Sequence, residues 1–238
     1  MIPKKHGGKV HTAKDYAAED SVDWTTESKV TPVKNQGSCG SCWSFSTTGS
    51  LEGAYAIKNN QNISTWNGFS EQNLVSCDTT DSGCNGGLMD DAFVWIQGNG
   101  GICSEDDYPY ASSSGTSPSC STTCTNVANS APADYTDVDT NEDALASAIS
   151  QQPVSVAIQA NQRAFQSYSG GVLTGRCGTR LDHGVLAVGY GTWTDGTEYW
   201  KVKNSWGDSW GLDGYILIEK GNDTDECGIL DMASYPTF

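Results

Sequence analysis

Apolar positions divide the chain into a helical first half and a strand-rich second half. Their spacing predicts helices at residues 42–57, 70–75, 88–97 and 141–151, the last with Asn141 as its N-cap. Runs of β-branched and aromatic residues bounded by glycine predict strands at residues 153–158, 184–190, 199–203 and 214–218. This order predicts an α+β fold with two subdomains, and the cleft between subdomains is a usual place for a functional site.

Two segments lie outside this pattern. Residues 111–131 are rich in Ser, Thr, Gly and Asn and are expected to form a long connection. Residues 1–17 carry an excess of lysine and lack the apolar stretch of a secretory signal, so we expect a leader or prosegment remnant. The main domain is then 18–238, with a helical subdomain at about 25–125 and a strand-rich one at about 126–238.

Charge narrows the possible partners. Lys and Arg number 13 against 29 Asp and Glu, which gives a net charge of −16. Nucleic-acid binding depends on neutralising phosphates, so an acidic body argues against that class of partner. No apolar run approaches the roughly 18 residues of a membrane helix, and no membrane association is expected. The charge fits an acidic or extracellular compartment, or serves solubility alone.

Cysteine is frequent, with nine residues spread along the chain. Zinc sites usually combine two CxxC or histidine knuckles, whereas this chain has one CxxC, and His6 and His11 lie in the leader. A disulfide framework is therefore expected, with no metal and an oxidising compartment. The odd count leaves one thiol unpaired. Asn62 and Asn222 begin glycosylation sequons, which are typical of secreted proteins.

Cys42 is the first candidate for chemistry. It follows a Gly- and Ser-rich loop and opens the predicted helix 42–57. A helix N-terminus stabilises a thiolate through its N–H groups and dipole, and the thiolate is the useful nucleophile. The alternative is that Cys39 and Cys42 form a redox pair or half of a metal knuckle. A thioredoxin-type motif belongs in a βαβ pattern, and none is visible here.

His183 and Asn204 complete the candidate constellation. His183 is the only histidine after the leader and begins an apolar strand beside Gly184. Asn204 follows the predicted strand 199–203, and a side-chain amide can hold one imidazole nitrogen while the other faces a thiol. Taken singly, a lone histidine is more often structural and an asparagine more often forms a turn.

Several separate segments together resemble the papain and cathepsin L family of cysteine proteases. They are residues 36–43, 84–87, 181–184, 204–207 and 227–229. The order Cys, His, Asn also matches, and the resemblance covers roughly residues 20–238. It implies a papain-like fold in which a helical half and an antiparallel β-barrel-like half enclose the active-site cleft, with the termini crossing over.

The resemblance also implies roles for individual residues. Cys42 would attack the peptide carbonyl, His183 would form an ion pair with it, and Asn204 would orient the histidine. The Gln36 amide and the Cys42 backbone N–H would form the oxyanion hole. Further positions match the family's substrate-binding residues: Gly40, Ser41, Gly86, Gly87, Leu88, Met89, Ala157, Leu181, Asp182, Trp206 and Met232. Trp206 would also shield the contact between Asn204 and His183.

The resemblance implies disulfide pairs and partners as well. Cys39 would pair with Cys84 and Cys177 with Cys227, while Cys77 and Cys103 would take Cys120 and Cys124 in an order that the sequence leaves open. No cofactor is implied. The implied partners are protein and peptide substrates, the chain's own removed prosegment and cystatin-like inhibitors. The protein is expected to be a monomer in a lysosome, a vacuole or the extracellular space.

Specificity follows from the implied pocket for the second residue before the cleaved bond, the P2 residue. All five positions of that pocket are apolar, namely Leu88, Met89, Ala157, Leu181 and Met232. An apolar P2 residue is therefore expected, because burying an unpaired cation is costly. Met232 should shorten the pocket and favour Leu, Val or Met over Phe or Tyr, unless it packs into the core instead.

Two other functions compete with an endopeptidase. A thiol–disulfide oxidoreductase would use Cys39 and Cys42 and would give no role to His183 or Asn204. A non-catalytic, disulfide-rich binding protein would be favoured by the loss of Cys42 or His183, and the chain keeps both. Within the family, no insertion resembling the occluding loop of cathepsin B is apparent, which favours an endopeptidase over a dipeptidyl exopeptidase.

Overall fold

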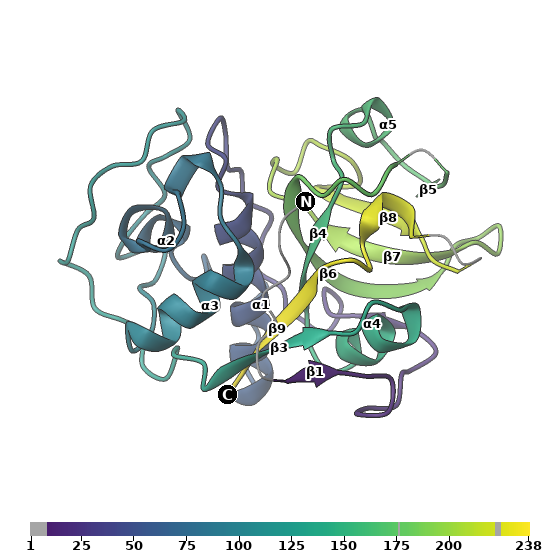
Figure 1. Ribbon diagram of the computed structural model, residues 1–238, viewed down its shortest axis with the longest axis horizontal. Coiled ribbons are helices and arrows are strands. Elements are labelled where there is room, and N and C mark those ends of the chain that lie inside the picture. The colour runs from purple at the N-terminus through teal and green to yellow at the C-terminus, as the bar shows by residue number, and fades with distance from the viewer. Residues whose placement is uncertain (1–8, 176, 222–224) are drawn as a thin grey trace.

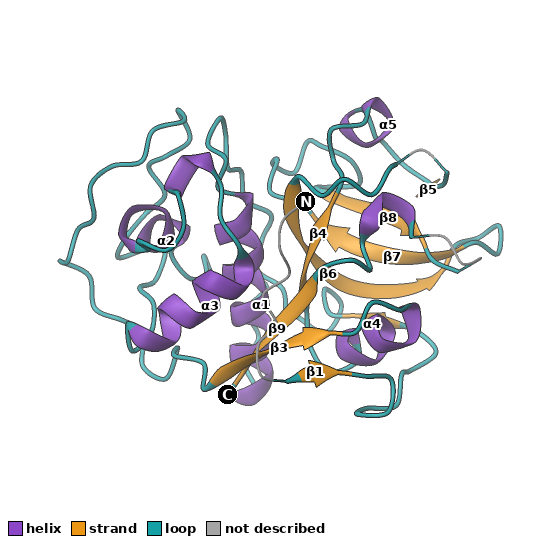
Figure 2. Cartoon of the chain, viewed as in Figure 1, coloured by secondary structure: helices purple, strands orange, loops and turns teal. Residues whose placement is uncertain are grey.

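The computed structural model describes residues 9–175, 177–221 and 225–238. Helices gather on one side and strands on the other (Figures 1 and 2). The helical half contains α1 (Cys42–Lys58), α2 (Glu71–Cys77), the short 3₁₀ helix η1 (Gly83–Asn85) and α3 (Met89–Gly98). The expected connection at 111–131 carries no helix or strand.

The strand-rich half is built on one sheet. Its strands are β1 (Val10–His11), β2 (Val22–Asp23), β3 (Asp134–Val138), β4 (Val154–Ile158), β5 (Val172–Leu173), β6 (His183–Thr192), β7 (Glu198–Lys203), β8 (Tyr215–Glu219) and β9 (Ala233–Thr237). Their order is β1-β3-β9-β4-β6-β7-β8-β5, with β2 paired to β6. Most neighbours are antiparallel, as expected, but β1 with β3 and β5 with β8 are parallel.

Three short helices accompany the sheet. They are α4 (Glu142–Ile149), α5 (Arg163–Gln166) and the 3₁₀ helix η2 (Glu226–Gly228). The main apolar core joins α4 to the central strands, where Leu145, Ile149, Val156 and Trp200 are almost fully buried. Burial of side chains of this size stabilises the fold by about 1.5–3 kcal/mol each.

Helix α1 lies between the two halves (Figure 1) and is buried along most of its length. Its glycines make this close packing possible. A Cβ on Gly49 would lie 2.8 Å from a Leu186 methyl, and a Cβ on Gly53 would lie 2.5 Å from the Pro153 ring. Ser46 also donates a hydrogen bond to the Val185 carbonyl. The helix therefore fixes the position of its own N-terminus against β6.

The predicted helices and strands agree with the structure to within a few residues. Asn141 caps α4 by accepting the Ala144 N–H at 2.9 Å. Strands β3 and β9 were not predicted. Polar residues in β3 and Pro236 in β9 interrupt the strand pattern of the sequence, although the two strands pair with each other over four residue pairs.

The first described residues belong to the sheet. Val10 and His11 pair with β3, and the His11 ring is 3% exposed. Its Nδ1 contacts the Tyr235 hydroxyl at 2.9 Å, and its Nε2 contacts the Ser147 hydroxyl at 2.8 Å. Pairing with β3 and burial of the imidazole hold residues 10 and 11 on the sheet, and the assignment of residues 1–17 as a leader or prosegment remnant stays a prediction.

Four disulfides join eight of the nine cysteines, all of which lie in the described part, and Cys42 is free. The pairs are Cys39–Cys84, Cys77–Cys120, Cys103–Cys124 and Cys177–Cys227. The first and last are the pairs that the family resemblance implied, and the structure settles the order that the sequence left open.

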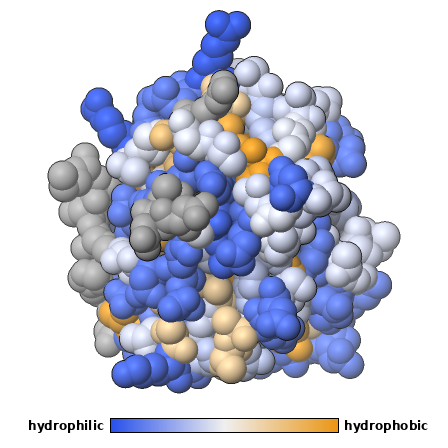
Figure 3. All heavy atoms as spheres, turned by 90° about the vertical axis from the view of Figure 1, so that its right-hand side faces the viewer, coloured by the Kyte–Doolittle hydropathy of each residue, from blue (hydrophilic) through white to orange (hydrophobic). Residues whose placement is uncertain are grey.

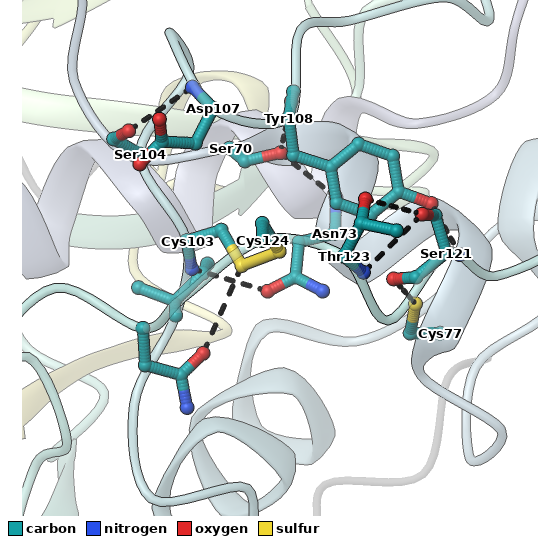
Figure 4. Close-up of a disulfide and its surroundings, with 12 residues drawn as sticks. Ser70, Asn73, Cys77, Cys103, Ser104, Asp107, Tyr108, Ser121, Thr123 and Cys124 are labelled. Atoms are coloured by element: carbon teal, nitrogen blue, oxygen red, sulfur yellow. Dashed lines mark hydrogen bonds between the residues drawn. A yellow bond between two sulfur atoms is a disulfide. The ribbon is translucent and has the colours of Figure 1, made fainter.

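Figure 4 shows how the Cys103–Cys124 disulfide is set against the helical half. The Cys103 N–H donates to the Asn73 side chain of α2 at 3.2 Å. The N–H of Asn73 in turn donates to Ser70, the N-cap of the same helix, at 2.9 Å. The long connection at 111–131 is therefore held against α2 by covalent and hydrogen bonds.

Among the described residues, no helix is long and apolar enough to cross a membrane. The face on the right-hand side of Figure 1 is mostly hydrophilic, with apolar residues scattered in small areas (Figure 3). Of the two candidate sequons, Asn62 is exposed, whereas Asn222 lies outside the described residues.

Candidate active site

Cys42 is the first residue of α1, the helix between the two halves. Its N-cap, Ser41, makes no side-chain capping bond, and no acidic residue occupies the first turn. The first N–H groups of a helix have no partner within the helix, so a negative sulfur is favoured here. The thiol hydrogen-bonds to His183 and to the backbone at Gly184 and Trp43.

His183 is the first residue of β6, in the strand-rich half, and its side chain is buried. The Nε2 atom lies 2.7 Å from the Asn204 Oδ1 atom, which also accepts the Ser205 N–H at 2.8 Å. A backbone N–H can only donate, so this Asn204 atom is the amide oxygen and His183 Nε2 must carry the proton. That arrangement leaves Nδ1 to face the Cys42 sulfur.

The two groups shift each other's pKa in opposite directions. Burial raises the pKa of the Cys42 thiol, but the hydrogen bond and charge of His183 outweigh it, so the pKa is lowered. Burial lowers the pKa of His183, but the bond and charge of Cys42 and the hydrogen bond to Asn204 outweigh it, so the pKa is raised. Both shifts favour a thiolate beside an imidazolium.

Aromatic side chains cover the base. The Trp206 ring lies 5.0 Å from the His183 ring, tilted by 32°, and Phe165 lies 5.5 Å from Trp206 in an edge contact. The Asn204 Nδ2 atom is buried and has no hydrogen-bond partner among the described residues. A hydrogen bond buried in such surroundings is stronger than one in water, and the shielding role of Trp206 stays a prediction.

Gln36 is buried and held at three points. Its backbone N–H donates to Ser205 O at 2.9 Å, its Oε1 accepts the Ser205 hydroxyl at 2.7 Å, and its Nε2 donates to Cys39 O at 2.8 Å. Nε2 carries two hydrogens, so one remains for a further acceptor. The side chain is therefore a fixed hydrogen-bond donor close to the start of α1.

A cavity of about 290 Å³ lies between the candidate residues. Most of the residues expected to bind substrate line it: Gly40, Gly86, Gly87, Leu88, Met89, Ala157, Asp182 and Met232, together with Cys42 and His183. Met89, Ala157 and Met232 are at most 5% exposed and belong to one apolar cluster. These three side chains form an apolar part of the lining, whereas Cys42, Asp182 and His183 are its titratable residues.

Glycine is required at two positions of the lining loop. Gly86 has a φ of +115°, a backbone conformation that favours glycine, and a Cβ there would meet nothing within 4 Å. A Cβ on Gly87 would lie 2.6 Å from an Asp81 oxygen and 2.6 Å from the Trp43 ring. The loop therefore offers bare backbone to the cavity and packs tightly behind it.

Three of the expected substrate-binding residues do not line the cavity. Ser41 is fully buried, and its hydroxyl lies 2.7 Å from the Tyr110 hydroxyl. Leu181 is half-buried beside the Met232 cluster. Trp206 lies against the base. Their predicted roles in substrate binding stay predictions, and the structure gives Ser41 a supporting contact.

Sequence reasoning missed two residues that support the site. Ser205 holds Gln36 Oε1, and the Tyr110 hydroxyl donates to the Gln36 carbonyl at 2.8 Å. Tyr110 lies 74 positions from Gln36, so no local pattern could reveal this contact. Ser205 adjoins Asn204, and its place in the 204–207 motif was the one available signal.

Only one group of described residues has the geometry of metal ligands, namely Cys177, Glu226 and Cys227. Both sulfurs are joined in a disulfide, and the Glu226 oxygens accept the N–H groups of Gly175 and Cys177. These atoms are therefore already engaged, and the group carries no argument for a metal site.

Comparisons with known proteins agree with this geometry. Residues 18–237 match the family model of papain family cysteine proteases. The chain is 52% identical to the thiol protease SEN102 of Hemerocallis sp., over 91% of this chain and 59% of that protein. It is 49% identical to the senescence-specific cysteine protease SAG12 of Arabidopsis thaliana, over 92% of this chain and 62% of that protein.

A solved structure has the same fold. The crystal structure of the Amb a 11 cysteine protease, a major ragweed pollen allergen, in its proform, matches with a TM-score of 0.85 and 41% identity. The match covers 93% of this chain and 66% of that one. This chain thus spans about three fifths of the length of the curated relatives SEN102 and SAG12.

Proposed function

This chain belongs to the papain family of cysteine proteases, and we propose that it is an endopeptidase with Cys42 as nucleophile and His183 as acid and base. One observation carries the proposal. Cys42, His183 and Asn204 form a hydrogen-bonded series beside a cavity with an apolar end. The names of the relatives, cysteine proteases and thiol proteases, support the same reaction class.

In the first step the peptide bond is broken and its acyl group is transferred to Cys42. With the thiol proton on His183, the Cys42 thiolate attacks the carbonyl carbon of the peptide bond, a C–S bond forms, and the carbonyl electrons move to oxygen. His183 Nδ1 then gives its proton to the amine nitrogen as the C–N bond breaks. The products are an amine and a thioester on Cys42.

Water completes the cycle. His183 takes a proton from water as the water oxygen attacks the thioester carbon, and collapse of the intermediate expels the Cys42 thiolate and releases the acid. The free hydrogen on Gln36 Nε2 and the Cys42 backbone N–H supply donors to the negative oxygen in both steps. One such donor contributes about 3 kcal/mol to catalysis.

We extend the proposal to specificity and setting. The apolar end of the cavity, formed by Met89, Ala157 and Met232, favours an apolar P2 residue, since a buried cation would have no partner there. The disulfides support an oxidising compartment, and the acidic charge is compatible with a lysosome, a vacuole or the extracellular space, which we propose as the setting. We propose a monomer that binds peptide substrates, its own prosegment and cystatin-like inhibitors.

The test is hydrolysis of a fluorogenic peptide with Leu at P2, at pH 5–6 with a mild reductant. Alkylation of Cys42 should abolish activity, and Cys42→Ala or His183→Ala should lower kcat/KM at least about thousandfold. Asn204→Ala should keep a measurable remainder because Asn204 orients the base and does not react. Asn59→Ala, an exposed change at the end of α1, is the control.

Two results would reject the assignment. The first is a His183→Ala variant that keeps most of its kcat/KM. The second is alkylation of both Cys39 and Cys42 without prior reduction. That outcome would contradict the Cys39–Cys84 disulfide and revive the thiol–disulfide oxidoreductase.

A further inference from the structure

The segment that joins α2 to α3, residues 78–88, carries part of the cavity wall. The Cys39–Cys84 disulfide and the hydrogen bond from Gly40 N–H to Cys84 O at 2.9 Å join it to the loop that precedes α1. Ser82 N–H also donates to Gly86 O at 2.9 Å. These bonds fix the loop up to Gly86. The positions of Gly87 and Leu88 depend on other contacts, on the side of the loop away from the cavity.

Two aspartates lie behind these residues. Asp81 Oδ1 accepts the Leu88 N–H at 2.8 Å, and the same oxygen would lie 2.6 Å from a Cβ on Gly87. Asp78 caps the other end of the turn, where its Oδ1 accepts the Thr80 N–H at 2.8 Å and the Asp81 N–H at 3.4 Å. Asp78 is 5% exposed.

The remaining oxygens of the two carboxyl groups have no donor. Asp78 Oδ2 and Asp81 Oδ2 are both buried and have no donor among the described residues, and the two carboxyl groups act on each other through a side-chain hydrogen bond. A charged carboxylate in this position would be buried next to a second negative charge. Two such groups lower their energy when one proton lies between them.

No cation of the described residues forms an ion pair with either carboxyl group. None of the ion pairs of the described residues includes Asp78 or Asp81. Asp91, in the first turn of α3, is the other charged group that acts on Asp81, and it is also acidic. Burial and the charge of Asp78 raise the pKa of Asp81 to about 8, against the lowering effect of the Leu88 N–H. Burial likewise raises the pKa of Asp78.

We propose that Asp78 and Asp81 share one proton, and that this proton holds Gly87 and Leu88 in place, so that Asp81 is a positioning residue for substrate binding. When the pair loses the proton, the two carboxylates repel each other and the Asp81 contact with Leu88 N–H is lost. The substrate-facing backbone of Gly86 and Gly87 then shifts. The link to substrate binding rests on the endopeptidase function proposed above.

The direction of the pH effect follows from the raised pKa of Asp81. The folded state holds the proton between the ordinary pKa of an aspartate and about 8, so the ordered loop is most stable at acid pH. Its stabilisation declines as pH rises through that range. Loss of one imidazolium proton from His183 would lower kcat/KM as well, so KM must be separated from kcat.

The kinetic test compares wild type with Asp81→Asn from pH 5.5 to 9. The asparagine amide donates permanently to Asp78 Oδ2 while its oxygen still accepts the Leu88 N–H. We expect the KM of wild type to rise about three- to tenfold by pH 8.5, and the KM of Asp81→Asn to change less than about twofold. Asp81→Ala, which cannot hold Leu88, should raise KM at every pH.

Asp107→Asn is the matched control, because it makes the same chemical change at an exposed aspartate outside the pair. A wild-type KM that does not depend on pH, or an Asp81→Asn variant that follows wild type, would overturn the proposal. If Asp81→Asn does not fold, Asp78→Asn places the amide donor on the other member of the pair and must give the same result.

A readout without turnover separates this proposal from the proposed function. Carbon-13 NMR of labelled aspartate carboxyl groups, on protein alkylated at Cys42, should show a step near pH 8 that disappears in Asp81→Asn. The step is expected even if the protein cleaves no peptide. Its absence in wild type would refute the shared proton whether or not the enzyme is active.

Discussion

At the scale of single residues, burial disfavours the charged forms of Cys42 and His183, but the interaction between the two groups stabilises both charges. Burial alone would protonate the thiol and deprotonate the imidazole, which would leave both groups neutral and the sulfur a poor nucleophile. Their mutual hydrogen bond and charge reverse both tendencies. Asn204 contributes by fixing Nε2 as the protonated nitrogen, so the pair has a single useful orientation.

We propose that the Met232 side chain limits the size of the apolar pocket. It is 5% exposed, lines the cavity and packs in the same cluster as Met89 and Ala157. Met232→Ala should shorten the side chain and admit larger P2 residues. We expect the ratio of kcat/KM for Phe over Leu at P2 to increase by about tenfold, as one or two buried methylenes are worth about 1–3 kcal/mol.

The measurement uses paired peptides that differ only at P2, with Leu, Phe or Arg. The exposed apolar residue Val94 on α3 offers the control variant Val94→Ala. Equal rates for Arg and Leu in wild type would contradict the apolar pocket. An unchanged ratio in Met232→Ala would show that the side chain does not limit the pocket.

The site residues that the sequence predicted share one property, namely that short motifs carry them. Cys42, His183 and Asn204 each lie in a motif of a few residues, so their chemistry is visible locally. Tyr110 acts through a contact with Gln36 that only the fold creates. Asp78 has local partners in Thr80 and Asp81, but the burial that makes these contacts important is set by the fold. The pairing of Asp78 with Asp81 also contradicts the ordinary expectation that acidic residues avoid each other when buried.

At the scale of elements, β1 shows that a two-residue strand can be well anchored. Its backbone pairs with β3, and the His11 side chain reaches Tyr235 of β9 and Ser147 of α4. The segment thus ties three elements together near the edge of the sheet. Its basic, polar sequence suggested a leader because the signal for burial rests on a single histidine.

Removal of the His11 side chain should weaken the fold. His11→Ala breaks two buried hydrogen bonds, and we expect a loss of about 2–3 kcal/mol in the free energy of unfolding at pH 7.5. Burial lowers the pKa of His11, so its contribution is present above the ordinary pKa of 6.5 and declines as pH falls below it. The difference from wild type should therefore shrink at pH 5.

Urea denaturation at both pH values measures this difference. Lys14→Ala, an exposed change three residues further along the chain, is the control and should alter stability by less than about 0.5 kcal/mol. A His11→Ala variant as stable as wild type at pH 7.5 would show that β1 does not contribute to the stability of the sheet.

The unpredicted strands have a related explanation. β3 and β9 pair with each other, with β3 next to the edge strand β1 and β9 next to β4. Tyr135 and Tyr235 are buried in them, but Asp and Ser residues lie between the apolar positions, and Pro236 forbids one backbone hydrogen bond. Their strand state depends on partners far away in sequence, which a local pattern does not contain.

At the scale of the whole molecule, a cluster of buried charges connects α1, α2 and β7. Lys34 Nζ lies 2.7 Å from Glu71 of α2 and 3.5 Å from Glu52 of α1, and it also donates to Phe69 O at 3.2 Å. Lys203 of β7 donates to Thr31 at 2.7 Å, and burial lowers its pKa to about 8. The cluster replaces apolar packing where the two halves meet.

Loss of the central cation should destabilise both halves together. Lys34→Met leaves Glu52 and Glu71 buried without their partner, and we expect a loss of about 3–5 kcal/mol in the free energy of unfolding. Thermal and urea denaturation would measure it. The control is Lys220→Met, which breaks an ion pair to the half-exposed Glu198 and should cost about 1 kcal/mol or less.

A Lys34→Met protein that unfolds like wild type would mean that the two glutamates take up protons at little cost. That outcome is recognisable, because stability would then fall steeply as pH rises. The raised pKa of Glu105, about 8, shows that one carboxyl group near Glu71 is already kept neutral by burial and by the charge of Glu71.

Cys42 and His183 lie on opposite sides of the boundary between the two halves. Cys42 is carried by α1, whose position depends on close packing against β6 and Pro153, while His183 is carried by β6 itself. The pKa of the Cys42 thiol therefore depends on the position of α1 relative to β6. A small displacement of α1 relative to β6 would therefore change the rate of alkylation at Cys42, even where circular dichroism of the whole protein does not change. The alkylation rate of this one sulfur thus reports on the relative position of the two halves.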